Sequence, residues 1–368
     1  MKDLSLYIHI PFCRCICLYC NFLTFANKTG QKGEYVKALS RQIRLLAPEC
    51  KNRPVKSIYF GGGTPSLLDD QHIQTILENI QTNYNVTKNA EISIEANPET
   101  ISIEKIEHYK DMGINRLTIG IQSLNDKSLF RVGRIHNKET ILNAISILKQ
   151  KEFKNFGIDY IIGMPFQTFE TFKNDLNTFI KLKIPHISLY FLSYDTPKID
   201  HFIKDCPNED EQIKIYEYAC QTLKMDGFTH YEVSNFAKTG FESVHNKRYW
   251  QQKEYLGFGI GGHSFFNNTV SENTNNFEEF LKAPLSKEDS FQLDPDLKRM
   301  DFIMLALRQK SGINLTTYQK IYGKESLEKL IANAKKLMSS GHMSHSGDCL
   351  FATEKGFLIL NHITEALL

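Results

Sequence analysis

Short apolar runs alternate with amphipathic stretches along the first 230 residues or so of the chain. The apolar runs have the length and composition of buried strands, at residues 6–10, 57–60, 91–96, 116–120, 156–162, 186–192 and 229–233. Helical spacing of apolar positions marks residues 34–47, 69–84, 103–112, 126–131, 138–151, 169–181 and 210–226. This alternation predicts βα units on a parallel sheet. Six or seven units favour a closed or partly closed barrel, with a doubly wound sheet as the alternative.

The pattern changes after residue 240. A glycine-rich run at 257–262 precedes an asparagine-rich stretch at 267–276, and we expect these to lead out of the barrel. Helical patterns follow at 294–308, 315–322 and 326–339, then a hairpin at 341–351 and a last helix at 353–366. That order is the outline of a winged helix. We therefore predict a partial, TIM-like (β/α)6 barrel over residues 1–240, a connecting segment over 241–293 and a smaller α+β, winged-helix-like domain over 294–368.

Composition narrows the class of protein. The 368 residues are 41% hydrophobic and 23% charged, as in folded globular chains, with a formal net charge of +2. This near-neutral balance predicts no nucleic-acid partner, even for a winged-helix-like domain. The longest apolar runs are about six residues, too short to span a bilayer. Asp3 and an interrupted apolar stretch argue against a signal peptide, so we expect a cytoplasmic protein with reduced thiols.

Half of the eight cysteines fall between residues 13 and 20. Cys13, Cys17 and Cys20 form a C-x3-C-x2-C pattern directly after a predicted strand. Three thiolates on one loop can bind three irons of a cubane and leave the fourth iron open to another ligand. A structural zinc site needs four tetrahedral ligands and is too cramped here, although zinc and redox-thiol interpretations stay open. Cys15 lies inside the pattern and could compete as a ligand.

The cysteine loop resembles that of radical S-adenosylmethionine (SAM) enzymes, and its surroundings resemble the branch that holds oxygen-independent coproporphyrinogen III oxidase and the HemW-type haem chaperones. The resemblance runs along nearly the whole chain. It is carried by GGGTPS at 61–66, EANP at 95–98, NR at 115–116, IGIQS at 119–123, GRIH at 133–136, GMP at 163–165, SLY at 188–190, YEVSNFA at 231–237 and HNKRYW at 245–250. It implies a radical SAM barrel that binds a [4Fe-4S] cluster on the three cysteines, and SAM.

The resemblance also implies which residues bind SAM. Glycines can bring bare backbone close to a ligand, and Gly62, Gly63 and Thr64 stand where the family holds the methionine part of SAM. A plain strand-to-helix turn is the alternative for this loop. Arg134 offers a planar fork of donors that suits a carboxylate.

Further candidates stand at or near the ends of predicted strands, where parallel barrels place their sites. Glu95, Gln122 and Asp159 match family positions for the nucleoside and amino groups of SAM. Tyr7 and Tyr19 flank the cluster loop, and Tyr19 stands where the family packs an aromatic residue near the adenine. Each lone polar residue could instead serve a structural hydrogen bond, and each tyrosine could be a core aromatic.

Two functions compete on this scaffold: a haem chaperone, and radical SAM decarboxylation of coproporphyrinogen III. By resemblance, the decarboxylase group has the pattern C-x3-C-x2-C-x-C. In this chain Phe22 stands where that pattern has its fourth cysteine. The decarboxylases also carry an N-terminal extension, and we expect this chain to lack it. Residues 245–250 match the H-N-x-x-Y-W motif of HemW proteins, and His245 is our candidate axial ligand for haem. A structural histidine is the alternative.

The chaperone interpretation is therefore favoured, and the decarboxylase is kept as the alternative. The expected partners are haem and a haem-acceptor protein, for which a respiratory-chain protein is one candidate. Transient association with a membrane surface is compatible with that role. The scattered cysteines are expected to be small buried hydrophobes.

Overall fold

One mixed sheet organises most of the chain. The computed structural model describes residues 2–50, 52–196 and 198–368. The strand order in the sheet is β12-β11-β10-β9-β1-β2-β3-β4-β5-β6-β8-β7. The strands are β1 (Leu4–Ile10), β2 (Pro54–Gly62), β3 (Asn85–Ala96), β4 (Arg116–Gln122), β5 (Phe156–Ile162), β6 (His186–Phe191), β7 (Thr229–Glu232), β8 (Asn235–Ala237), β9 (Tyr255–Phe258), β10 (His263–Phe266), β11 (Thr269–Asn273) and β12 (Lys287–Gln292).

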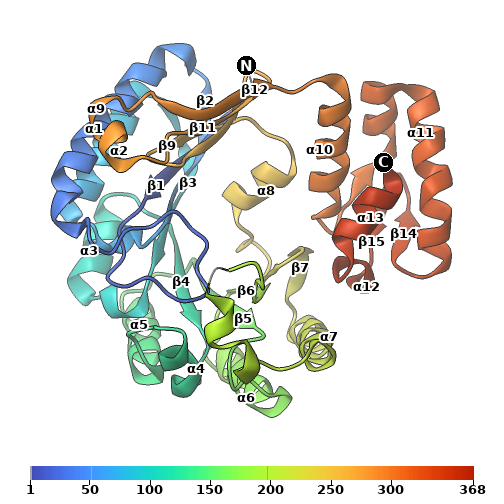
Figure 1. The fold of residues 1–368 in the computed structure, drawn as a ribbon, viewed down its shortest axis with the longest axis horizontal. Coiled ribbons are helices and arrows are strands. Elements are labelled where there is room, and N and C mark those ends of the chain that lie inside the picture. The colour runs from blue at the N-terminus through green and yellow to red at the C-terminus, as the bar shows by residue number, and fades with distance from the viewer. Residues whose placement is uncertain (1, 51, 197) are drawn as a thin grey trace.

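The six strands β1 to β6 run parallel and in sequence order, and helices connect them. The sheet curves like part of a barrel wall, with helices along its outer side and α8 on its inner side (Figure 1). The helices are α1 (Lys32–Leu46), α2 (Asp70–Asn83), α3 (Ile103–Asp111), α4 (Asp126–Arg131), α5 (Lys138–Gln150), α6 (Phe169–Lys181), α7 (Glu209–Met225), α8 (Val244–Trp250) and α9 (Phe277–Lys282). The predicted partial barrel is confirmed.

The alternation of side chains along β1 shows how the wall is built. Leu6, Ile8 and Ile10 belong to the main hydrophobic core, which includes apolar residues of the outer helices. Because successive side chains of a strand point to opposite faces, Tyr7 and His9 lie on the other face. The sequence thus directs apolar residues toward the helices and polar aromatic ones toward the inside.

Two predicted features differ from the structure. The seventh strand, β7, does not extend the parallel series, because it forms an antiparallel hairpin with β8, which is itself antiparallel to β6. Residues 241–293 do not lead away from the barrel. They add β9, parallel to β1, and the antiparallel strands β10 to β12. A side chain at Gly257 would overlap the carbonyl of His263, so the glycine-rich run permits a close return of the chain within the sheet.

The last part of the chain has a hydrophobic core of its own, which includes Leu307, Tyr318, Leu350 and Ile363. It lies beside the barrel, with α10 and α8 in contact (Figure 1). Its elements are α10 (Pro295–Leu307), β13 (Ile313–Asn314), α11 (Leu315–Ser339), β14 (Met343–Ser346), β15 (Cys349–Ala352), α12 (Glu354–Phe357) and α13 (Leu360–Leu367). The two helices predicted within α11 are joined across a kink at Gly323, whose φ is +87°. Within the described residues, no helix is long and apolar enough to cross a membrane.

Candidate functional site

A cavity of about 390 Å³ lies at the carboxyl ends of the parallel strands, where barrel folds place their sites. Its lining brings together residues from the cysteine loop and from the ends of several strands. The predicted site residues that line it are Cys13, Cys17, Tyr19, Cys20, Gly62, Gly63, Thr64, Glu95, Gln122, Arg134 and Asp159. Tyr7 and His245 do not line it. Predicted site residues as far apart in sequence as Cys13 and Asp159 are therefore assembled around one space.

The cysteine loop is held by its own backbone. The N–H of Cys13 donates to the carbonyl of Phe25 at 3.1 Å, and the N–H of Phe25 donates to Pro11 at 2.7 Å. Farther along, the N–H of Leu18 donates to the carbonyl of Val132 at 3.0 Å. The loop is thus closed at its base and fixed to the segment that carries Arg134.

The three predicted ligand thiols differ in their burial at the cavity. Cys13 and Cys17 are buried and Cys20 is partly buried. Within the described residues, no three His, Cys, Asp or Glu side chains converge as ligands of one metal ion would. In a cubane each thiolate binds a different iron, so convergence on one point is not required. The three thiols line one cavity, and their ligation of an iron–sulfur cluster stays a prediction.

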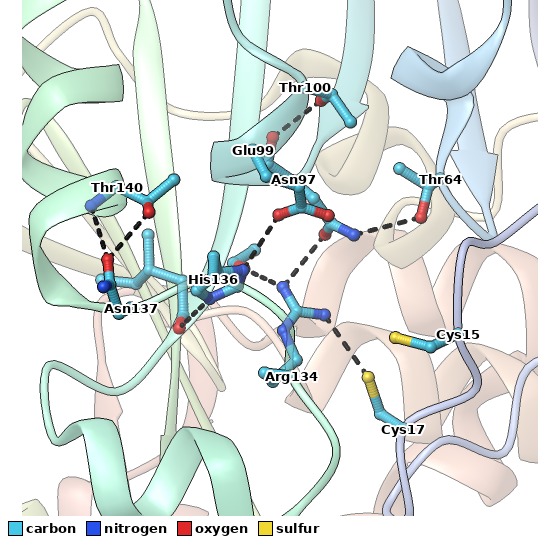
Figure 2. Close-up of polar contacts among 12 residues, drawn as sticks. Cys15, Cys17, Thr64, Asn97, Glu99, Thr100, Arg134, His136, Asn137 and Thr140 are labelled. Carbon is cyan, nitrogen blue, oxygen red and sulfur yellow. Dashed lines mark hydrogen bonds and ion pairs between the residues drawn. The ribbon is translucent and has the colours of Figure 1, made fainter.

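Arg134 links the cysteine loop to the strand ends (Figure 2). Its Nη1 lies 3.6 Å from the Sγ of Cys17, and its Nη2 donates to Asn97 Oδ1 at 3.0 Å and to the carbonyl of Gly120. The neighbouring Cys15 thiol and this guanidinium lower the pKa of Cys17 to about 5. A thiolate is the form that binds metal, so the loop holds Cys17 ready for ligation.

The Cys15 thiol lines the same cavity and lies beside the thiol of Cys17. Its Sγ donates to the carbonyl of Gly133 at 3.3 Å, and the residue is partly exposed. The hydrogen bond with Cys17, followed by burial, raises the pKa of Cys15 strongly. Cys15 therefore stays a protonated thiol beside the thiolate of Cys17.

Sequence reasoning missed three polar residues that complete this network (Figure 2). Asn97 Nδ2 donates to Thr64 Oγ1 at 3.2 Å. His136 Nδ1 lies 3.0 Å from Glu99 Oε2, and this contact lowers the pKa of Glu99 although burial opposes it. Asn97 and His136 stand within the quoted motifs EANP and GRIH, so the signal was present without an assigned role.

Two half-buried carboxyl groups face the cavity with different surroundings. Glu95 accepts hydrogen bonds from Tyr59 OH at 2.8 Å and from the N–H of Gly62 at 3.2 Å. Burial raises the pKa of Glu95 to about 7 and that of Asp159 to about 6. The Oδ1 atom of Asp159 is buried without a hydrogen-bond partner among the described residues. Buried polar atoms are normally satisfied, so Asp159 marks a place for a donor supplied by a ligand.

The backbone of the glycine loop is fixed against the cysteine loop. The N–H groups of Gly63 and Thr64 donate to the carbonyls of Ile10 and Phe12, each at 2.8 Å. A Cβ on Gly63 would lie 2.8 Å from the Phe12 oxygen, so this close approach requires glycine. The loop and the cysteines thereby form one rigid unit at the cavity wall.

His245 is structural in this fold. It is fully buried, and its Nδ1 lies 2.9 Å from Ser57 Oγ while its Nε2 lies 2.8 Å from Tyr249 OH. Because the Ser57 hydroxyl donates to Ser5, it must accept from Nδ1–H, and Tyr249 then donates to Nε2. Burial and nearby Arg248 lower the pKa of His245 to about 3, so the ring is neutral. Neither nitrogen is left for iron, and the structure does not support the predicted axial ligand.

Comparison with known proteins identifies the family of this chain. The Radical SAM superfamily profile matches residues 7–179, and the HemN C-terminal domain profile matches residues 293–359. "Heme chaperone HemW" of Lactococcus lactis is 33% identical and aligns with 100% of this chain and 98% of its own length. The chain belongs to the HemW family. The Escherichia coli protein of the same name is 35% identical over 72% of this chain and 70% of its own length.

The fold of this HemW-family chain also matches a solved structure, the coproporphyrinogen III oxidase (HemN) from Escherichia coli. The TM-score is 0.88 at 22% identity, over 100% of this chain and 90% of that one. At this identity the match establishes the shared radical SAM fold. Membership of the superfamily implies a [4Fe-4S] cluster and SAM.

Proposed function

We propose that this protein is a haem chaperone that binds haem and passes it to an acceptor protein. The observation that carries the proposal is the full-length similarity to HemW proteins, together with a cavity lined by Cys13, Cys17 and Cys20 and by most of the predicted SAM-binding residues. We further propose that it acts in the cytoplasm, and that residues 1–240 and 294–368 serve as its cluster-binding and partner-facing parts. A respiratory-chain protein reached by transient membrane association is our candidate acceptor.

The cavity fits the two resident cofactors. Cys13, Cys17 and Cys20 would hold the cluster, which supplies an iron with an open position when it is bound. Asp159 offers an unpaired buried oxygen, and Arg134 has a buried Nε without a partner among the described residues. These orphaned groups are suited to the charged and hydroxyl groups of SAM. Gly62, Gly63 and Thr64 present bare backbone to the same space.

Phe22 favours the chaperone over the decarboxylase. Phe22 occupies the position at which the decarboxylase pattern has a further cysteine. Its side chain is 70% exposed at the edge of the cavity. A phenyl ring can stack on a porphyrin but cannot bind iron or exchange a proton. An apolar ring at this position therefore favours binding of a porphyrin over its decarboxylation.

The test begins with anaerobic reconstitution of the full chain, followed by analysis of iron and sulfide. We expect about four irons per chain in the wild type and in Cys15→Ser, and loss of the cluster in Cys17→Ala. The cluster-loaded protein is then given SAM, a reductant and coproporphyrinogen III, with haem in a parallel sample. We expect one haem bound per chain and no decarboxylated product. Formation of protoporphyrinogen would instead establish the decarboxylase.

A further inference from the structure

A second cavity, of about 730 Å³, lies beside the first. Asn21 and Phe22, at the end of the cysteine loop, line both cavities and form their common wall. The other walls come from β1, from β9 to β11, from α8 and from α10 of the C-terminal domain. The second cavity therefore adjoins the cluster loop, and of the predicted SAM-binding residues Tyr7 alone lines it.

The walls of the second cavity are aromatic. Tyr7, Tyr249, Trp250, Tyr255 and Phe265 all line it. Flat aromatic rings favour flat apolar ligands, and the volume is within the usual range of about 300–1,000 Å³ for ligand pockets. The chemistry of this lining thus suits a large planar aromatic molecule.

The role of His245 becomes clear beside this cavity. Its Nε2 accepts from Tyr249 OH, and the two rings meet edge to face with centroids 4.8 Å apart. Tyr249 is further packed against Tyr255, with centroids 4.5 Å apart. On the adjacent residue, Arg308 covers one side of the Trp250 ring. His245 therefore positions a wall of the cavity instead of contacting its contents.

His263 is the histidine in this lining that has a ring nitrogen available for metal. Its Nδ1 lies 3.1 Å from the carbonyl of Gly261, which can only accept, so Nδ1 must carry the hydrogen. In the neutral ring, Nε2 then holds a lone pair, and the side chain is 58% exposed. Glu272 Oε2 is 3.5 Å from Nε2, longer than a well-formed N–H···O bond. By contrast, both nitrogens of His9 are occupied, by Tyr7 OH and by the carbonyl of Leu23.

A backbone carbonyl on one nitrogen with the other left free is the usual orientation of a metal-binding imidazole. Two further residues of the lining match the needs of a haem. Met304 on α10 brings a thioether, which is a known haem ligand, and exposed Lys253 brings a cation for the propionate groups.

We propose that the second cavity is the haem-binding site and that His263 Nε2 is an axial ligand of the haem iron. This inference rests on the proposed function, because it assigns a binding site to the haem that the chaperone would carry. The imidazole lone pair would form the bond to iron and displace a weakly held water, with no change in oxidation state. Haem and SAM would then occupy adjacent cavities separated by Phe22.

The experiment is a titration of the full, cluster-loaded chain with haem, followed by the Soret band, with and without SAM. His263→Ala is compared with His362→Ala, whose side chain is 83% exposed on α13 and lies outside both cavities. We expect His263→Ala to shift the Soret band and to weaken binding by about tenfold or more, as losses at metal sites commonly do. Added imidazole should restore the wild-type spectrum. His362→Ala should behave as wild type.

A second variant tests the cavity without changing His263. Val270→Trp fills the cavity from the β10–β11 hairpin and should abolish stoichiometric haem binding while SAM binding stays unchanged. If wild-type protein takes up no haem, the proposed function itself is wrong. If wild type binds haem but His263→Ala keeps its spectrum and affinity, or if SAM displaces haem, only the assignment of this site is overturned.

Discussion

Asp159→Asn tests whether the cavity is held in a strained, ligand-ready state. Burial raises the pKa of Asp159 from 3.8 to about 6 in the folded chain. A group whose folded pKa is raised contributes stability that is fully present below its unfolded pKa and is lost as the pH rises through the folded pKa. The shift of about 2.2 units corresponds to about 3 kcal/mol above pH 6, at about 1.4 kcal/mol per unit. Ionised Asp159 thus destabilises the ligand-free protein at neutral pH.

The asparagine is nearly isosteric and never ionises, so it removes this penalty. We expect the advantage of Asp159→Asn over wild type to grow by about 1.4 kcal/mol between pH 5 and pH 8, because about half of the effect is already present at pH 5. The same substitution should lower the affinity for SAM, since it removes a carboxylate that would accept a hydrogen bond from SAM. The variant therefore separates stability from binding.

The assay is urea unfolding at pH 5 and pH 8, followed by the fluorescence of Trp250, the only tryptophan of the chain. Trp250 ends α8 and so reports on the barrel. Ser188→Ala is a useful control, since Ser188 gives Asp159 a hydrogen bond that opposes the pKa shift, and its loss should enlarge the pH effect. A variant whose advantage is the same at both pH values, or absent at both, would refute the assigned strain.

Three further predictions concern stability and cluster assembly. Gly63→Ala places a Cβ 2.8 Å from the Phe12 oxygen and should lower the free energy of unfolding by about 1–3 kcal/mol, measured by urea unfolding; an unchanged midpoint would contradict the close contact. Cys15→Ser should retain the reconstituted cluster, and loss of its visible absorption would make Cys15 a ligand. His245→Phe removes both buried hydrogen bonds and should lower stability by about 2–4 kcal/mol without moving the Soret band of bound haem; a moved band would return His245 to the list of ligands.

The sequence predicted the parallel part of the fold closely because its signals are local. The bounds expected for β5, α4 and α6 agree with the structure, since each apolar run is limited by polar or turn residues. The addition of β9 to β12 was not predictable in the same way. The glycine run at 257–262 looks like a linker in sequence, and only the pairing of β9 with β1 shows that it turns inside the sheet.

Part of the candidate site was likewise predictable from the sequence, and part was not. Residues at the ends of β2 to β5 converge because parallel strands share one edge, and motif order was enough to propose them. The direction of a side chain within α8 was not available from a motif. Residues 245–250 marked an important segment, but the partners that occupy both nitrogens of His245 come from β2 and from the next turn of the helix. His263 carried no motif, so only its free nitrogen beside a cavity identifies it.

The most direct test of the chaperone proposal is the rate of haem transfer. The haem-loaded chain is mixed with increasing concentrations of an apo-haem protein, and the Soret bands of donor and acceptor are followed by stopped flow. Delivery through a protein–protein complex predicts a rate that rises with acceptor concentration and exceeds the rate of spontaneous haem loss. A rate that equals spontaneous loss at every acceptor concentration would contradict a chaperone and leave only passive haem binding.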